Sequence, residues 1–161
     1  MNDVLDLAAD YGRFEVRDLI LRPDSWKTFP LSSQLSWTAV PVRTTPAAGI
    51  PTTKGVYTFV VRPEIANHPH CAYLMYVGKA EGADGFRGRY GSYLRVRSEG
   101  ELSNRPLVMK MMVNWFDHLW FCYAALTTDV VATEDALLRA YLPPINTDFP
   151  ADISKAVRAF H

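Results

Sequence analysis

The 161-residue sequence has few cysteines and no long apolar run, and each shortage excludes a class of protein. Its two cysteines, Cys71 and Cys122, stand among apolar residues. We expect them to be buried free thiols in a reducing compartment, since two cysteines make a disulfide framework a poor explanation. No apolar stretch approaches the roughly 18 residues that a membrane-spanning helix needs, which argues against a membrane partner. The acidic N-terminus has no basic and apolar regions of the signal-peptide type, so the expected location is the cytoplasm.

The sequence also lacks an excess of charge of either sign. It has 17 basic and 17 acidic side chains, and a net charge of zero argues weakly against nucleic acid as a partner. The charges are nevertheless segregated along the chain. Seven basic and four acidic residues lie between Lys79 and Lys110, whereas the first thirty residues carry six acidic and four basic ones. This is a modest hint of an anionic ligand near the middle of the chain, although solvated surface charge is the commoner explanation.

The N-terminal third is expected to be an irregular arm. Residues 2–10 are typical of a short acidic helix, while residues 13–21 fit either a strand or a further helix. The segment from Arg22 to Thr53 contains five prolines and two tryptophans. Repeated prolines discourage long helices, and the tryptophans indicate that this segment packs on a core. We therefore divide the chain into an accessory segment, residues 1–53, and a core domain, residues 54–161.

The core domain has the composition and patterning of a small α/β or α+β fold. Hydrophobic residues make up 48% of the chain and aromatic residues 12%, which is enough for a single core. Runs of β-branched and aromatic residues predict strands at 55–63, 71–78 and 119–126. Capping residues and apolar periodicity predict helices at 86–98, 105–116 and 127–142, and a short last helix within 152–160. The expected architecture is a three-stranded central sheet flanked by helices.

Several short motifs follow one another along this domain. They are Gly55-Val56-Tyr57, Tyr76-Val77-Gly78 with Lys79 directly after it, Arg89 with Tyr93 four residues later, and Glu134 with Leu137, Leu138, Pro143 and Asn146. Each alone has an ordinary explanation, as strand aromatics, strand-end glycines, a surface arginine, an acid in a first helical turn or a turn asparagine. Together and in this order they resemble the GIY-YIG nuclease family, over residues 54–147. The likeness around YVGKA is closest to the nuclease half of the bacterial excision-repair incision subunit.

The resemblance implies a metal-dependent endonuclease that hydrolyses DNA phosphodiester bonds. The implied catalytic residues are Tyr57, Tyr76, Lys79, Arg89, Tyr93, Glu134 and Asn146. Glu134 would be the metal ligand, for Mg²⁺ or Mn²⁺. The implied DNA- and phosphate-binding residues are Lys79, Arg87, Arg89 and Arg95, with Gly55 and Gly78 as structural positions. The partner would be DNA, and the neutral chain would need its arm, a homodimer or a larger complex to hold it.

The chemistry of these residue types fits such a reaction. A single carboxylate at Glu134 suits Mg²⁺, which keeps most of its waters and accepts a substrate phosphate. The guanidinium of Arg89 can fork onto two phosphate oxygens. A tyrosine has an ordinary pKa of about 10 and is a poor base unless nearby cations lower it. We favour Tyr57 or Tyr76 as the base without deciding between them, and expect Asn146 to support the site more than to take part in the chemistry.

Other patterns in the sequence are weaker. His68 and His70 lie beside Cys71, but no second pair stands at metal-ligand spacing. The stretch GKAEGADG differs from a phosphate-binding P-loop, since its lysine precedes the glycines. Two loops, RPEIANHPHCA and EGADGF, are longer than in compact family members. A non-catalytic nucleic-acid-binding or protein-interaction module that keeps the fold, or a structural protein that uses the tryptophan-bearing arm, remains the alternative.

Overall fold

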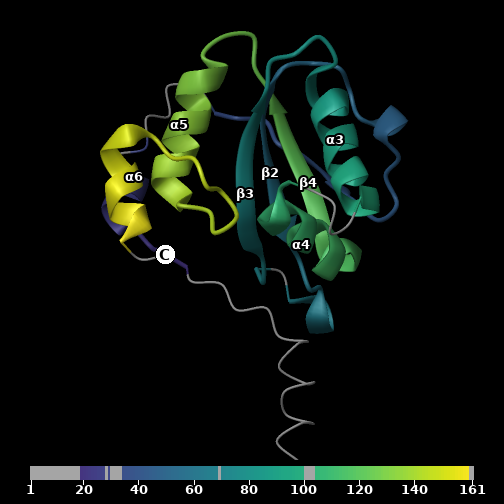
Figure 1. The fold of residues 1–161 in the computed structure, drawn as a ribbon, viewed down its shortest axis with the longest axis horizontal. Coiled ribbons are helices and arrows are strands. Elements are labelled where there is room, and N and C mark those ends of the chain that lie inside the picture. The colour runs from purple at the N-terminus through teal and green to yellow at the C-terminus, as the bar shows by residue number, and fades with distance from the viewer. Residues whose placement is uncertain (1–18, 28, 30–33, 69, 100–103, 160–161) are drawn as a thin grey trace, which may run out of the picture.

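The computed structural model describes residues 19–27, 29, 34–68, 70–99 and 104–159 (Figure 1). The helix expected at residues 2–10 and most of the segment 13–21 lie outside these residues. The described elements are α2 (Pro23–Lys27), β1 (Thr38–Pro41), η1 (Ala47–Gly49), β2 (Gly55–Val61), η2 (Ile65–Asn67), β3 (Tyr73–Ala80), α3 (Gly85–Glu99), α4 (Pro106–Asn114), η4 (Phe116–His118), β4 (Leu119–Ala125), α5 (Val130–Tyr141) and α6 (Ala151–Arg158).

A four-stranded antiparallel sheet in the order β1-β4-β2-β3 forms the centre of the fold. The α+β class and the three strands of the core domain are confirmed. The expectation of a three-stranded sheet is wrong by one strand, because β1 lies inside the proline-dotted segment and pairs with β4. This strand has four residues and ends at Pro41, and proline is tolerated at a sheet edge because it donates no ladder hydrogen bond there.

The two faces of the sheet are covered by different helices, because side chains alternate along each strand. One face carries a mostly aromatic core in which α3 and α4 pack on Tyr57, Phe59 and Phe121. The other face buries Val56 and Val77 against α5. Figure 1 shows α3 and α4 on one side of the sheet and α5 with α6 on the other. This arrangement leaves β3 as an edge strand between the two helical layers.

The described part of the arm is attached to the rest of the fold. The indole nitrogen of Trp26 on α2 donates a hydrogen bond of 2.7 Å to the carbonyl of Ala140 on α5. Val42 and Ile50 are buried in the main core. The division at residue 53 stays a prediction, but residues on its N-terminal side belong to the same sheet and core as β2.

Two smaller expectations concern exposure and membranes. Cys71 and Cys122 are free thiols, as expected, but both are partly exposed and not fully buried. In the described ranges, no helix has the length and apolar character needed to cross a membrane.

Candidate functional site

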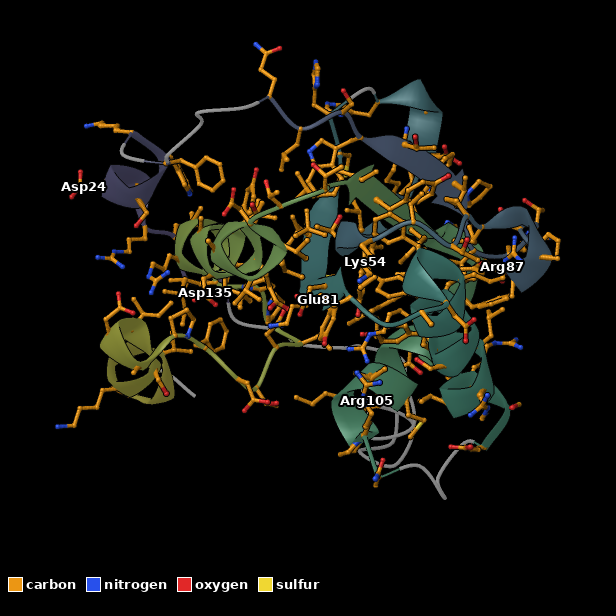
Figure 2. The ribbon with its side chains drawn as sticks, turned by 90° about the horizontal axis from the view of Figure 1, so that it is seen from above. Asp24, Lys54, Glu81, Arg87, Arg105 and Asp135 are labelled. Carbon is orange, nitrogen blue, oxygen red and sulfur yellow. The ribbon has the colours of Figure 1, made fainter. Side chains whose placement is uncertain are left out.

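The residues of the sequence motifs meet beside the edge strand β3. A cleft of about 780 Å³, which we call the β3 cleft, is lined by residues of β3, α3, the start of α4, α5 and the segment 145–150. Five of the sequence-predicted site residues line it: Tyr76, Lys79, Arg89, Glu134 and Asn146. In Figure 2 the labelled Asp135 on α5 and Arg105 at the start of α4 mark two sides of this cleft.

Lys79 and Glu134 form a close ion pair inside the cleft. Lys79 is the second-last residue of β3, and Glu134 lies on α5, which covers the same face of the sheet. The Lys79 Nζ donates to Glu134 Oε2 at 2.6 Å, and the two side chains are 34% and 15% exposed. This hydrogen bond is the main cause that raises the pKa of Lys79. The candidate metal ligand therefore already holds a cation, supplied by the protein itself.

Three tyrosines form a cluster behind the cleft. The hydroxyl groups of Tyr57 and Tyr93 are 2.9 Å apart. The rings of Tyr57 and Tyr76 are stacked with their centroids 6.3 Å apart, and the Tyr76 and Tyr93 centroids are 5.7 Å apart. Arg89 Nε donates to the Tyr57 hydroxyl at 3.2 Å. Of the three tyrosines, only Tyr76 lines the cleft. Tyr57 is 0% exposed, and its hydrogen bond with Arg89 connects it to a residue that does line the cleft.

The two motif glycines make room for this cluster. A β-carbon on Gly78 would lie 2.5 Å from the Tyr57 hydroxyl oxygen, so the tyrosine can cross β3 only because position 78 has no side chain. A β-carbon on Gly55 would lie 2.1 Å from the carbonyl oxygen of Ala124 on the neighbouring strand. Gly55 also has a φ of 152°, which other residues rarely adopt. Both glycines thus have a physical reason to stand where the sequence places them.

The environment of the tyrosines keeps their hydroxyl groups protonated. Burial raises the pKa of Tyr57 to about 12, although the charge of Arg89 acts in the opposite direction. Burial is also the largest cause that raises the pKa of Tyr76 and of Tyr93. The nearby cations therefore lower the pKa values of these tyrosines by less than burial raises them. At neutral pH these hydroxyls act as hydrogen-bond donors and acceptors, which can orient a water without taking its proton.

Asn146 closes the open edge of β3. Its Oδ1 accepts a hydrogen bond of 2.9 Å from the Val77 amide, and its Nδ2 donates one of 2.8 Å to the Val77 carbonyl. The adjacent Ile145 amide donates to the Met75 carbonyl at 3.1 Å. A single side chain thus supplies both bonds that a neighbouring strand would make. The contacts hold the segment after α5 against the strand that carries Tyr76 and Lys79.

Two of the expected phosphate-binding arginines lie elsewhere. Arg87 donates to the backbone carbonyls of Ile50 at 2.9 Å and Ala48 at 3.4 Å, and Figure 2 shows it beside the η1 turn. Arg95 is exposed on α3 and does not line the β3 cleft. The helix explains both, because positions two residues before and six residues after Arg89 point in other directions from the axis. Only Arg89 of these three arginines lines the cleft.

The structure adds residues to the cleft that the sequence motifs did not identify. Arg105, which directly precedes α4, donates from Nη2 to the Tyr93 hydroxyl at 3.3 Å. Asp135 and Asp148 also line the cleft. No motif spacing points to these three residues. The only signal in the sequence was that Arg105 belongs to the basic stretch between Lys79 and Lys110.

Three carboxylates line the cleft, those of Glu134, Asp135 and Asp148, but they do not form a complete cage for a hard cation. Within the described part of the chain, no group of three or more His, Cys, Asp or Glu side chains is arranged to hold a metal ion. The Glu134 carboxylate nevertheless lines the cleft and binds the Lys79 ammonium, so its oxygens are accessible from the cleft as possible metal ligands. This donor set fits Mg²⁺ or Mn²⁺ held through one carboxylate, water and a substrate phosphate.

Two further observations bear on the identity of the site. The histidines at 68 and 70 do not line the β3 cleft. Comparison of the chain with family models, curated proteins and solved structures gives no match. An assignment of function to this protein therefore rests on its residues and on the geometry of the cleft.

Proposed function

We propose that the protein is a metal-dependent endonuclease that hydrolyses DNA phosphodiester bonds in the β3 cleft through a GIY-YIG type of active site. The observation that carries the proposal is the convergence of motif residues from separate elements. Lys79 of β3 contacts Glu134 of α5 at 2.6 Å, and Arg89 of α3 contacts Tyr57 of β2 at 3.2 Å. Fifty-five residues separate the first pair in the sequence and thirty-two the second. The two contacts join four elements and involve only residues that the resemblance assigns to one active site.

The distribution of charge in the cleft supports an anionic substrate together with a cation. Arg89 and Arg105 are on the side formed by α3 and α4, while Glu134, Asp135 and Asp148 are on the side formed by α5 and the segment after it. A phosphodiester can lie against the arginines while a hydrated divalent cation lies between it and the carboxylates. The formal neutrality of the chain is then compatible with DNA, because the charges are sorted within the site.

Each residue has a role that follows from its position. Arg89 binds the phosphate and stabilises the charge that grows on its oxygens. Glu134 would hold Mg²⁺ or Mn²⁺, which when bound supplies Lewis-acid stabilisation of the phosphoryl oxygens. The protonated hydroxyl of Tyr76 orients the attacking water, which gives its proton to bulk water as its oxygen bonds to phosphorus. The Lys79 ammonium can donate a proton to the leaving oxygen as the bond between that oxygen and phosphorus breaks. Asn146 keeps β3 and the segment after α5 in register.

The decisive experiment is DNA cleavage with matched variants. Supercoiled, linear and branched DNA are incubated with the full chain and Mg²⁺ or Mn²⁺, and single-turnover rates are compared with those of Glu134→Gln and Arg89→Ala. We expect both variants to lose at least about 100-fold in rate, because each removes a stabiliser of charge in the transition state. Asp117→Asn, an exposed acid whose ion pair is with Arg43, is the control and should keep the full rate. Wild-type protein that cuts none of these DNAs with either metal would remove the enzymatic proposal.

A non-catalytic nucleic-acid-binding module is the second candidate, and one observation favours it. The ion pair between Lys79 and Glu134 occupies the carboxylate that a metal would need. If that pair is the permanent state of the site, the cleft binds a phosphate backbone and does not cut it. DNA binding without cleavage, unchanged by added Mg²⁺ or Mn²⁺, would support this second candidate over the first.

A further inference from the structure

Arg105 has a position in the cleft that none of the motifs explains. It is the residue before α4, whose first helical position is Pro106, and the Met109 amide donates to the Arg105 carbonyl at 2.9 Å. The helix behind it is anchored in the core by Val108 and Met111. The backbone of Arg105 is therefore set by a rigid element, and its side chain extends from there into the β3 cleft.

The side chain of Arg105 is held in place by Tyr93. Its Nη2 donates to the Tyr93 hydroxyl at 3.3 Å, and its Cζ lies 4.9 Å from the centroid of the Tyr93 ring. A guanidinium that rests on an aromatic ring has its plane fixed by that contact. Holding an arginine in this way lowers the entropic cost of binding, since fewer rotamers are lost when a ligand arrives.

Arg105 and Arg89 stand at the two ends of one hydrogen-bonded chain. The chain runs from Arg89 to the Tyr57 hydroxyl at 3.2 Å, on to the Tyr93 hydroxyl at 2.9 Å, and then to Arg105 at 3.3 Å. One guanidinium comes from α3 and the other from the residue before α4, and both line the cleft. The buried tyrosine pair thus fixes the spacing between two positive charges that face the same space.

We propose that Arg105 is a second phosphate-binding residue of the β3 cleft, and that it and Arg89 together hold the DNA backbone against the wall of the cleft formed by α3 and the start of α4. This inference rests on DNA being the substrate, as proposed above, but it concerns binding and not the cleavage step. Arginine suits the task because its planar fork matches the oxygens of a phosphodiester. The acidic residues on the opposite side of the cleft leave this wall as the surface that an anion would contact.

The test is the salt dependence of DNA binding, measured by fluorescence anisotropy with a short labelled duplex and the full chain. EDTA is present, so that no cleavage interferes. Each phosphate contact adds about 0.9 to the slope of log K against log salt. We expect Arg105→Ala to lower the slope by about one unit and the affinity by roughly tenfold at moderate salt. Arg105→Lys keeps the charge without the fork, so it should keep the slope and lose affinity.

The matched control is Lys110→Ala, an exposed cation on α4 outside the cleft, which should leave the slope unchanged. If Arg105 only supports Tyr93, Arg105→Ala will lower the melting temperature and keep the wild-type slope, and the inference is wrong. A wild-type chain that binds no duplex at all also overturns it. A chain that binds DNA with an Arg105-dependent slope but cuts nothing supports the inference while removing the proposed endonuclease activity.

Discussion

At the residue scale, the absence of a methyl group at position 78 allows Tyr57 to cross β3. A β-carbon on Gly78 would lie 2.5 Å from the Tyr57 hydroxyl oxygen. We therefore expect Gly78→Ala to lower the free energy of unfolding by about 1–3 kcal/mol, as overpacked cores do. Urea unfolding measures the change. The control is Gly91→Ala on α3, where a β-carbon would meet nothing within 4 Å and where alanine should stabilise the helix by up to about 1 kcal/mol.

The ion pair of Lys79 with Glu134 leads to a second prediction, about metal affinity. The Lys79 ammonium lies 2.6 Å from Glu134 Oε2, where it competes with any metal for the carboxylate. We expect Lys79→Met to bind Mn²⁺ more tightly than the wild type, by up to about fivefold, which is the scale of a partly exposed ion pair. Titration calorimetry without DNA measures this affinity. Glu134→Gln should weaken binding in the same assay, and an unchanged affinity in Lys79→Met would contradict the competition.

Spacing along the sequence identifies some site residues and misses others, for a physical reason. Arg89 and Glu134 belong to a spaced pattern, and both line the cleft. Arg105 belongs to no pattern, because its position depends on how α4 packs against α3. Arg87 and Arg95 are the same residue type as Arg89 and lie near it in the sequence. Their positions around the axis of α3 nevertheless direct them away from the cleft. Side-chain direction on a helix decides which of several neighbouring cations reach a site.

At the scale of elements, the segment after α5 completes the edge of β3 through one side chain. Asn146 makes two hydrogen bonds to the backbone of Val77. We expect Asn146→Ala to cost about 1–3 kcal/mol of stability, since it leaves two backbone groups without their partner. Hydrogen exchange would show faster exchange of the Val77 amide, while the amides of β2 stay protected. Thr147→Ala, at an exposed neighbouring position, should change stability by less than about 0.5 kcal/mol.

The strand β4 and the helix α3 are elements whose positions can be predicted from local sequence patterns. The strand expected at 119–126 is β4 at Leu119–Ala125, and the helix expected at 86–98 is α3 at Gly85–Glu99. A run of apolar and aromatic residues predicts the strand, and the spacing of apolar residues predicts the helix. The strand β1 was missed because its four residues are short, are flanked by an irregular segment and end in proline. Its pairing with β4 is a tertiary effect that no local pattern encodes.

At the scale of the whole molecule, the buried tyrosines link stability to alkaline pH. The pKa of Tyr57 rises from 10.0 to about 12 on folding because the side chain is desolvated. Between these values the unfolded chain has lost this proton and the folded chain keeps it. The free energy of unfolding must therefore fall as the pH rises from 10 toward 12.

Urea unfolding across this pH range measures that loss. We expect Tyr57→Phe to make the fall less steep, because the substituted ring has no proton to lose in either state. Tyr141→Phe changes an exposed ring on α5 and should leave the wild-type slope as it is. A variant at position 57 with the same pH profile as the wild type would contradict the assignment of this loss to the buried cluster.

The closed edge of β3 also bears on how this protein associates with other chains. An exposed edge strand is a template onto which another chain can add a strand, and such edges lead to aggregation or domain exchange. Ile145 and Asn146 occupy the backbone groups of Met75 and Val77, so the side of the sheet next to the cleft is protected from such growth. Within the described sheet the other outer strand is β1. A strand added at the β3 edge would have to displace the contacts of Ile145 and Asn146, so the cleft side of the sheet resists this kind of pairing.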